Sequence, residues 1–166
     1  MTRAVLSIGS NLGDRLGHLR LAVEGFAGSL VAVSPVYETA PWGVTDQDDF
    51  LNAVLIVSDE VDEWGWLRRG QALEEASGRV RERRWGPRTL DVDVVSVDGV
   101  TSAAPELLLP HPGAFERATV LVPWLDVEPG AVLPGHGRVA DLVAGLDLSG
   151  VTRRDDLRLG DRSTRG

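Results

Sequence analysis

Short apolar runs alternate with helix-like segments up to residue 97, and this alternation restricts the fold more than any other feature. The first apolar run, residues 4–8, ends at a Gly-Ser-Asn turn, and behind Asp14 apolar residues recur at helical spacing as far as Gly28. Residues 31–39 and 50–58 predict two further strands, the former interrupted by a proline and the latter following a long loop.

A second helix and a fourth strand complete the series. Residues 62–77 contain mostly helix-forming residues, and residues 89–97 are apolar again up to an Asp-Gly turn. The resulting order, βαββαβ, predicts a ferredoxin-like α+β sandwich in which an antiparallel sheet is backed by two helices. Residues 115–125 predict one more helix, in a C-terminal extension.

Size and composition indicate one folded domain with a tail. A chain of 166 residues that is 43% hydrophobic can bury a substantial core, so we expect a single domain over residues 1–148. Residues 149–166 are polar and rich in arginine and aspartate, which predicts a frayed tail. No apolar stretch approaches the length of about 20 residues that crosses a bilayer, and no leader pattern is present at the start. We therefore expect a cytoplasmic protein, and we expect it to be a monomer.

The net charge and the absence of cysteine and lysine exclude several classes of function. A formal net charge of -8 argues against non-specific binding to nucleic acid or to anionic membranes. The absence of cysteine excludes disulfides and thiolate metal sites. The 17 basic residues are all arginine, which excludes a P-loop and a Schiff-base lysine. Any metal must bind to oxygen or to imidazole.

Two carboxylates, Asp91 and Asp93, lie one residue apart in the fourth predicted strand. Alternate residues of a strand share a face, so both side chains point away from the core that Leu90, Val92 and Val94 face. Two close carboxylates repel unless a cation neutralises them. The cation could be arginine, with the pair on a solvated face, or it could be a divalent metal.

An arginine-rich loop precedes the pair and favours the metal. Five arginines fall within residues 79–88. Mg²⁺ in proteins typically binds one or two carboxylates together with substrate phosphates, and arginine binds phosphate in a bidentate manner. The acidic pair and the basic loop together predict a site for Mg-ATP.

Several motifs resemble those of one enzyme family. They are GSNLGDR (9–15), YETAPWG (37–43), DFLNAV (49–54), GRVRERRWGPRTLDVD (78–93), and LPHP with ERATVLVP (109–123). In this order they resemble 6-hydroxymethyl-7,8-dihydropterin pyrophosphokinase, an enzyme of folate biosynthesis, over about residues 4–135. The resemblance implies a ferredoxin-like fold and the transfer of pyrophosphate from ATP to the pterin hydroxymethyl group, with release of AMP.

The resemblance also implies roles for individual residues. Asp91 and Asp93 would bind two Mg²⁺ ions, and Arg79 and Arg88 would contact the phosphates and counter charge on the transferring group. The implied ATP contacts are Gln71, Glu74, Arg81, Trp85, Arg88, His111 and Arg117. Such chemistry consists of alignment and charge stabilisation, so no covalent nucleophile is needed.

The implied pterin pocket combines an aromatic plane with a carboxamide. Its members by resemblance are Thr39, Ala40, Trp42, Phe50, Asn52 and Trp85. Asn52 lies in the apolar run FLNAVLIV, where a buried carboxamide is costly unless it has hydrogen-bond partners. Thr119 replaces a phenylalanine that usually stacks on the pterin, so the pocket is either one-sided or completed by Phe115 or Trp42.

One alternative is a non-catalytic module. Ferredoxin-like sheets also serve as nucleic-acid-binding and small-molecule-binding domains. An RNA-binding sheet needs exposed aromatic residues and a basic face, whereas these strands are aliphatic and the protein is acidic. A small-molecule-binding module would leave Asp91 and Asp93 unexplained.

Overall fold

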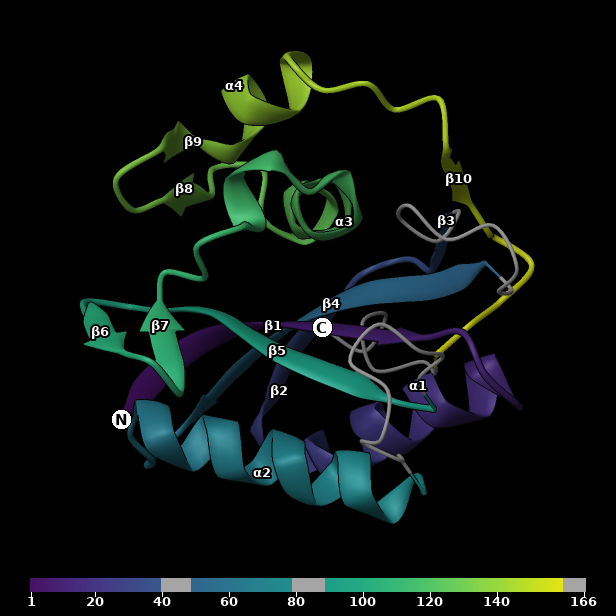
Figure 1. Cartoon of the computed structure of the whole chain (residues 1–166), viewed down its shortest axis with the longest axis horizontal. Helices are drawn as coiled ribbons and strands as arrows, with labels where there is room; N and C mark the ends of the chain where they lie inside the picture. The colour runs from purple at the N-terminus through teal and green to yellow at the C-terminus, as the bar shows by residue number, and fades with distance from the viewer. Residues whose placement is uncertain (40–48, 79–88, 160–166) are drawn as a thin grey trace.

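A six-stranded antiparallel sheet forms the centre of the molecule. The computed structural model describes residues 1–39, 49–78 and 89–159. Within them the sheet consists of β1 (Thr2–Ser10), β2 (Leu30–Val33), β3 (Tyr37–Thr39), β4 (Phe50–Asp59), β5 (Asp91–Val97) and β10 (Val151–Arg153). The strands lie in the order β10-β3-β4-β1-β5, and β2 pairs with β4 beside β3 (Figure 1).

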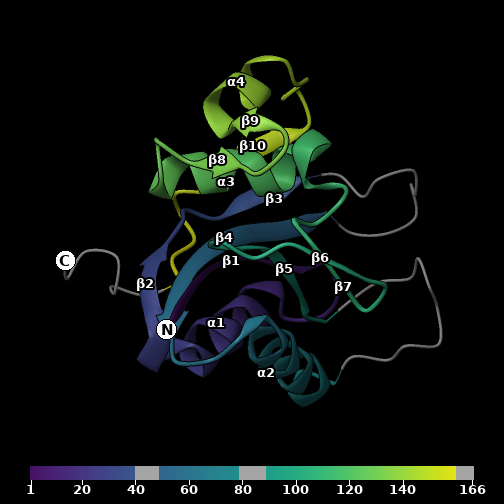
Figure 2. The ribbon, with the colours of Figure 1, turned by 90° about the vertical axis from the view of Figure 1, so that its left-hand side faces the viewer.

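Helices cover both faces of this sheet (Figures 1 and 2). The first layer contains α1 (Arg15–Gly25) and α2 (Glu63–Ala76), and the second contains α3 (Ala118–Val127) and α4 (Val139–Ala144). The prediction of two helices behind the sheet is confirmed for α1 and α2, but it missed that the C-terminal extension supplies a second layer. The expected fold class, mixed α and β with an antiparallel sheet, is confirmed at that level.

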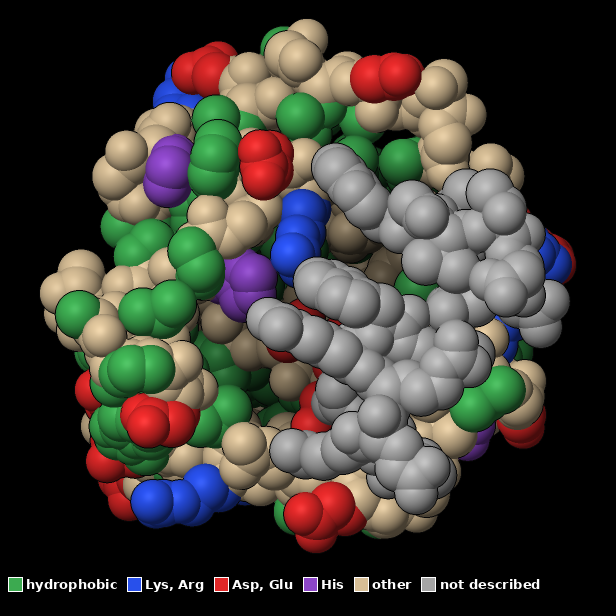
Figure 3. Space-filling view, viewed as in Figure 1, with side chains coloured by type: hydrophobic (Ala, Val, Ile, Leu, Met, Phe, Trp, Pro, Cys, Tyr) green, Lys and Arg blue, Asp and Glu red, His purple; other side chains and the backbone are tan. Residues whose placement is uncertain are grey.

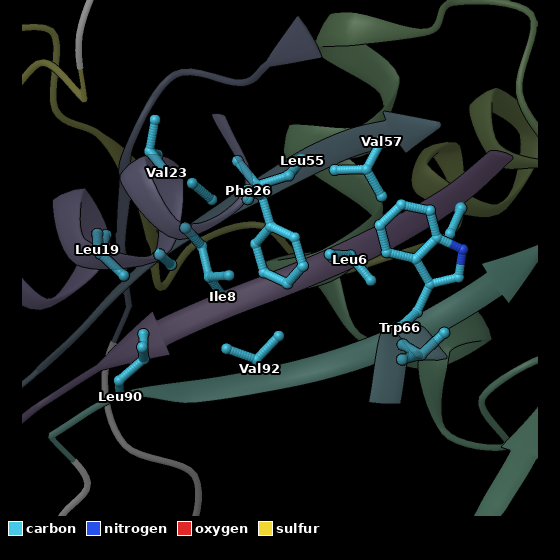
Figure 4. Packing of buried hydrophobic residues seen from close by; sticks show 14 of the residues in the cluster. Leu6, Ile8, Leu19, Val23, Phe26, Leu55, Val57, Trp66, Leu90 and Val92 are labelled. Carbon is cyan, nitrogen blue, oxygen red and sulfur yellow. The ribbon is translucent and has the colours of Figure 1, made fainter. Parts of the chain in front are cut away.

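Each layer has its own hydrophobic core. Figure 4 shows the larger core, in which Phe26 and Trp66 pack against the sheet with ring centroids 6.3 Å apart. The smaller core lies between the sheet and α3, where Leu121 and Trp124 are almost fully buried. Because both faces of β4 are covered, its residues from Leu51 to Val57 are all buried, and the strand reads as a continuous apolar run.

Aspartates begin the first two helices. Asp14 accepts a hydrogen bond from the Gly17 N–H at 3.0 Å, which confirms the predicted cap of α1. Asp62 caps α2 in the same way through the Gly65 N–H at 2.8 Å. Gly70 inside α2 has a packing reason, because a Cβ there would lie 2.9 Å from Cγ1 of Val92.

The predicted strand over residues 31–39 is divided into β2 and β3. Pro35 has no N–H to donate and lies between them, as the sequence indicated. Ser34 holds the break beside β4, since its N–H donates to Val54 O at 2.9 Å and its Oγ accepts from Val54 N–H at 2.8 Å.

A β-bulge in β5 assigns its side chains to the two cores. The register with β1 shifts between Val5 and Leu6, which leaves Val95 as the extra residue. Val92 and Val94 pack in the core on the α1 and α2 face, and Val95 packs under α3. By alternation, Asp91 and Asp93 therefore lie on the α3 face, opposite the valines as predicted.

The prediction of a frayed tail from residue 149 is wrong for the residues that the structure describes. Residues 151–153 form β10, which pairs antiparallel with β3 at the edge of the sheet. Leu159 is 7% exposed and belongs to the larger core. The polar composition misled because an edge strand needs only its backbone to pair; residues 160–166 lie outside the described part of the chain.

The remaining elements are short. They are η1 (Ala27–Ser29), β6 (Ser102–Ala104), β7 (Leu107–Leu109), η2 (Ala114–Glu116), β8 (Val132–Leu133) and β9 (Gly137–Arg138). The helix predicted over residues 115–125 starts later, at Ala118, because the chain first makes the 3₁₀ turn η2. Among the described residues, no helix combines the length and apolar character that a membrane span requires.

Candidate functional site

The strand register aligns the predicted pterin and metal residues across the α3 face. Tyr37 of β3 lies opposite Asn52 of β4, Asn52 lies opposite Gly9 of β1, and Gly9 lies opposite Asp91 of β5. Neighbouring strands are about 4.8 Å apart, so the backbones at Asn52 and Asp91 are roughly 10 Å apart. One register row therefore connects a carboxamide at one end with a carboxylate at the other.

Asn52 and Thr39 form the carboxamide end of the row. Both side chains are buried, and Asn52 Nδ2 donates to Thr39 Oγ1 at 3.0 Å. This bond joins β3 to β4 and uses one donor hydrogen of the amide. Phe50, which lies opposite Thr39, is partly buried beside them.

Gly9 lies between the two ends and was not identified from the sequence. A Cβ at this position would lie 2.9 Å from Asn52 Oδ1 and 3.7 Å from Cδ1 of Phe50. The missing side chain leaves room for the Asn52 carboxamide and the Phe50 ring to lie close to the backbone of β1. A glycine inside a strand is the sequence signal for close approach by another group, and it could have marked this position.

The carboxylate end of the row concentrates negative charge in a buried place. Burial, the negative charge of Asp91 and then that of Glu74 raise the pKa of Asp93 to about 8, although the positive charge of Arg117 opposes the shift. Without a cation, the site therefore favours the protonated form of this carboxyl group. Binding a divalent ion would remove the repulsion, so the donor chemistry of the pair fits a hard metal.

Glu74 is placed beneath the pair and Gln71 is not. Glu74 is 4% exposed, and its Oε2 accepts a hydrogen bond from the Val92 N–H at 2.8 Å, between the two aspartates. Gln71, one turn earlier in α2, is exposed. Of the two implied ATP contacts in α2, only Glu74 is therefore buried, and its described contact is with β5.

His111 and Arg117 reach the same carboxylates from the segment before α3. The His111 N–H donates to Val95 O at 2.8 Å, which fixes the histidine beside β5. Its Nδ1 accepts from Gly113 N–H at 3.2 Å, so the neutral ring carries its hydrogen on Nε2. Burial and then the charge of Arg117 lower the pKa of His111 below its usual value, against the opposing charge of Asp91.

Arg117 ends the turn before α3, and its guanidinium packs against Gly113. A Cβ on Gly113 would lie 3.2 Å from Arg117 Nε. The charge of Arg117 acts on both His111 and Asp93. In Figure 3, basic, histidine and acidic side chains gather around a hollow near the middle of the face that is shown. The structure therefore brings together predicted residues from β5, α2 and the segment before α3.

Six predicted residues lie outside the described part of the chain. They are Ala40, Trp42, Arg79, Arg81, Trp85 and Arg88. Of the residues that flank the arginine-rich segment, Ser77 and Thr89 are hydrogen-bonded, with Oγ and Oγ1 2.8 Å apart.

Phe115 already has an aromatic partner. Its ring stacks on the His136 imidazole with centroids 4.5 Å apart and an interplanar angle of 4°. Phe115 also packs against the smaller core, so its ring is engaged within the α3 and α4 layer. Of the two residues considered for completing the pterin stack in place of Thr119, Phe115 is therefore not favoured.

The described residues offer two acidic ligands for a metal. Residues 1–39, 49–78 and 89–159 contain no group of three or more His, Asp or Glu side chains arranged to hold a metal ion. Mg²⁺ commonly binds through one or two carboxylates plus water and substrate phosphate. The pair Asp91 and Asp93 fits that mode, in which the protein supplies part of the coordination and the nucleotide the rest.

Comparisons with known proteins show similarity to one family. Residues 5–129 match the model of the 7,8-dihydro-6-hydroxymethylpterin-pyrophosphokinase family. The chain is 48% identical to the 2-amino-4-hydroxy-6-hydroxymethyldihydropteridine pyrophosphokinase of Mycobacterium tuberculosis, covering 96% of this chain and 90% of that one. It is 46% identical to the enzyme of the same name from Methylorubrum extorquens, covering 92% and 99%.

Solved structures show the same fold. The crystal structure of wild-type Plasmodium falciparum HPPK-DHPS with pteroate matches with a TM-score of 0.66 at 14% identity, over 87% of this chain. This chain spans only 42% of that longer protein. The family match and the curated relatives carry the assignment: the chain belongs to the 7,8-dihydro-6-hydroxymethylpterin-pyrophosphokinase family and is an ATP-dependent diphosphotransferase of folate biosynthesis.

Proposed function

We propose that the row from Asn52 to Asp91 is the place where this enzyme transfers pyrophosphate from ATP to the hydroxymethyl oxygen of 6-hydroxymethyl-7,8-dihydropterin. The observation that carries the proposal is the register of Asn52, Gly9 and Asp91 across three adjacent strands. The separation of roughly 10 Å between the ends suits a flat bicyclic substrate with its polar edge at Asn52 and its hydroxymethyl group at the carboxylates.

The pterin end provides a complementary hydrogen-bond pattern. Asn52 offers Oδ1 as an acceptor and the second Nδ2 hydrogen as a donor, because the first is used by Thr39. Phe50 offers an aromatic face beside Gly9. Ala40, Trp42 and Trp85 are proposed to complete the pocket, on the basis of the family resemblance alone.

The carboxylate end is proposed to hold magnesium. Asp91 and Asp93 would bind two Mg²⁺ ions together with the ATP phosphates, and the ions would neutralise charge on the phosphates and on the attacking oxygen. Glu74 holds the backbone between the two ligands through the Val92 N–H. The hydroxymethyl oxygen would attack the β-phosphorus and lose its proton to solvent, while the bond between the β-phosphorus and the oxygen of the α-phosphate breaks and AMP leaves with that electron pair.

The cationic and neutral donors around the pair are proposed to bind the nucleotide. Arg117 balances negative charge near Asp93, and the Nε2 hydrogen of the neutral His111 ring can donate to a phosphate or ribose oxygen. Arg79, Arg81 and Arg88 are proposed as further phosphate contacts, and Gln71 as a contact with the nucleoside.

The strand order supports a ferredoxin-like topology for the central unit. Counting β2 and β3 as one interrupted strand, the order β5, β1, β4, β3 corresponds to the spatial order 4-1-3-2 with α1 and α2 on one face. We expect one catalytic domain that extends beyond the predicted boundary at residue 148, because β10 pairs with β3. We expect the enzyme to be a cytoplasmic monomer, which sedimentation and cell fractionation would check.

The non-catalytic alternative is disfavoured by the α3 layer. An RNA-binding sheet presents its aromatic face to solvent, whereas α3 and its core cover much of the sheet face that carries Asn52 and Asp91.

The decisive experiment is an AMP-release assay. AMP is expected only when ATP, Mg²⁺ and the reduced pterin alcohol are all present. Control reactions omit each of these three components in turn. Asp91→Asn and Asn52→Ala are expected to separate the two ends of the row, the first lowering kcat and the second raising the pterin KM. Equal effects of both variants on the pterin KM and kcat would contradict the assignment of the two ends.

A further inference from the structure

Glu38 on β3 joins two arginines from distant parts of the chain. Arg15, the first residue of α1, donates from Nη1 to Glu38 Oε2 at 2.7 Å. Arg154, directly after β10, donates from Nη1 to Glu38 Oε1 at 2.6 Å. The three side chains are 21% to 28% exposed, so these ion pairs are partly shielded from water. We call Glu38, Arg15 and Arg154 the β3 clamp.

The clamp also reaches the start of β4. Arg15 Nη1 donates to the backbone oxygen of Asp49 at 2.8 Å, directly before the first residue of the strand. Arg154 is itself oriented by Asp156, which accepts from its Nε at 3.0 Å and from its Nη2 at 2.8 Å. The clamp thus connects α1, β3, the entry to β4 and the segment after β10.

The segment around β10 supports the outer edge of β3 along its full length. Residues 151–153 pair with residues 39–37, and the Arg154 N–H donates to Val36 O at 2.8 Å. The other side of β3 pairs with β4 over three residues. A strand this short has few backbone bonds of its own to fix its register, so side-chain anchors carry more of that task.

The register of β3 determines where Thr39 points. Thr39 and Tyr37 lie on the α3 face, where the Tyr37 hydroxyl donates to Asp126 of α3. Glu38 lies between them in sequence and points to the opposite face, toward α1. A shift by one residue would exchange the two faces, removing Thr39 from Asn52 and breaking the clamp.

We propose that Glu38 is a positioning residue for the pterin site, acting with Arg15 and Arg154 to hold β3 and the entry of β4 in the register that places Thr39 against Asn52. The inference rests on the proposed pterin site. It gives the segment around β10 a role in substrate binding, because Arg154 supplies one half of the clamp. Glu38 contacts no substrate in this arrangement and acts through the backbone of β3.

The test is steady-state kinetics of Glu38→Gln and Arg154→Gln in the full-length chain. Glu38→Gln keeps the size of the side chain and removes its charge, whereas Arg154→Gln removes the charge and shortens the side chain. We expect the pterin KM to rise about tenfold in each, with kcat within about twofold of wild type and the ATP KM unchanged. The double variant should be no worse than about the poorer single variant, since both act through one clamp.

Glu24→Gln is the matched control, because Glu24 is an exposed glutamate of α1 outside the clamp and the site. It should leave all three kinetic parameters unchanged. An unchanged pterin KM in both clamp variants would overturn the inference, as would a fall in kcat alone together with a lower thermal midpoint. A variant that fails to fold, judged by circular dichroism, would assign the clamp to folding and likewise overturn its positioning role.

The outcome for the Asn52→Ala variant separates this inference from the proposed site. If Asn52→Ala leaves the pterin KM unchanged, the pterin site itself is wrongly placed. If Asn52→Ala raises the pterin KM and the clamp variants do not, the site stands and only the positioning role of Glu38 fails.

Discussion

Replacing Asp93 with asparagine should stabilise the metal-free protein while abolishing turnover. Burial, followed by the negative charges of Asp91 and Glu74, raises the pKa of Asp93 to about 8. In the unfolded chain the same carboxyl group ionises near its usual pKa of about 3.9. The wild-type protein therefore loses stability as the pH rises from about 4 to about 8, because the unfolded state releases a proton that the folded state retains.

The magnitude follows from the pKa difference. At pH 7 the unfolded carboxyl group has passed its pKa by about three pH units, at about 1.4 kcal/mol per unit, which gives an upper value of about 4 kcal/mol. Asp93 keeps some contact with water, so screening reduces the cost and we expect about 2 kcal/mol. Asparagine has no proton to lose, so Asp93→Asn should recover this amount at pH 7 and almost none at pH 4.

The assay is urea denaturation in EDTA at several pH values from about 4 to about 8.5. The stability difference between Asp93→Asn and wild type should grow with pH and level off above about pH 8. Asp141→Asn, which changes an exposed aspartate of α4, serves as the control and should show no such growth. A stability difference that is constant with pH, or a variant that is less stable throughout, would refute the reasoning. Mg-ATP should raise the thermal midpoint of wild type and leave that of Asp93→Asn unchanged.

Three further predictions concern Gly9, the β3 clamp and β10. Gly9→Ala places a Cβ 2.9 Å from Asn52 Oδ1. The pterin KM should therefore rise by roughly tenfold in steady-state assays while the ATP KM stays constant. An equal rise in both KM values would argue against a local clash at Asn52. Hydrogen bonding from Arg15, followed by that from Arg154, lowers the pKa of Glu38. The stability that Glu38 contributes is therefore present at neutral pH and is lost as the pH falls through its lowered pKa, so Glu38→Gln should flatten the acid limb of a thermal-unfolding profile; identical acid limbs would contradict this. Truncation after Gly150 removes β10 and exposes the edge of β3, and should lower the thermal midpoint by about 5 °C; an unchanged midpoint would restore the view of this segment as a dispensable tail.

Local patterns in the sequence were enough for the order of the central elements. The Asp14 cap, the break at Pro35 and the apolar runs that became β1, β4 and β5 each depend on residues close together in the chain. The alternation in β5 also placed Asp91 and Asp93 on one face. These features follow from backbone geometry, which acts over a few residues and is therefore visible in the sequence.

Other features depended on contacts between distant segments. The pairing of β10 with β3 joins residues more than a hundred positions apart, and no apolar pattern marks it, because backbone groups alone make the bonds. The role of Gly9 likewise depends on Asn52, which strand pairing brings beside it. Gln71 is exposed and Glu74 is buried, because α2 packs on β5 on the side that carries Glu74.

By itself, the sequence determined which residue types carry the chemistry: the paired aspartates, the arginines near them and the carboxamide in an apolar strand. Only the tertiary structure decided that Asn52, Gly9 and Asp91 form one row. It also decided that Glu38 is held by Arg15 and Arg154, which are far apart in the sequence. The physical reason is that a residue's chemistry is fixed by its own atoms, whereas distance and burial depend on strand register and on helices packed from elsewhere in the chain.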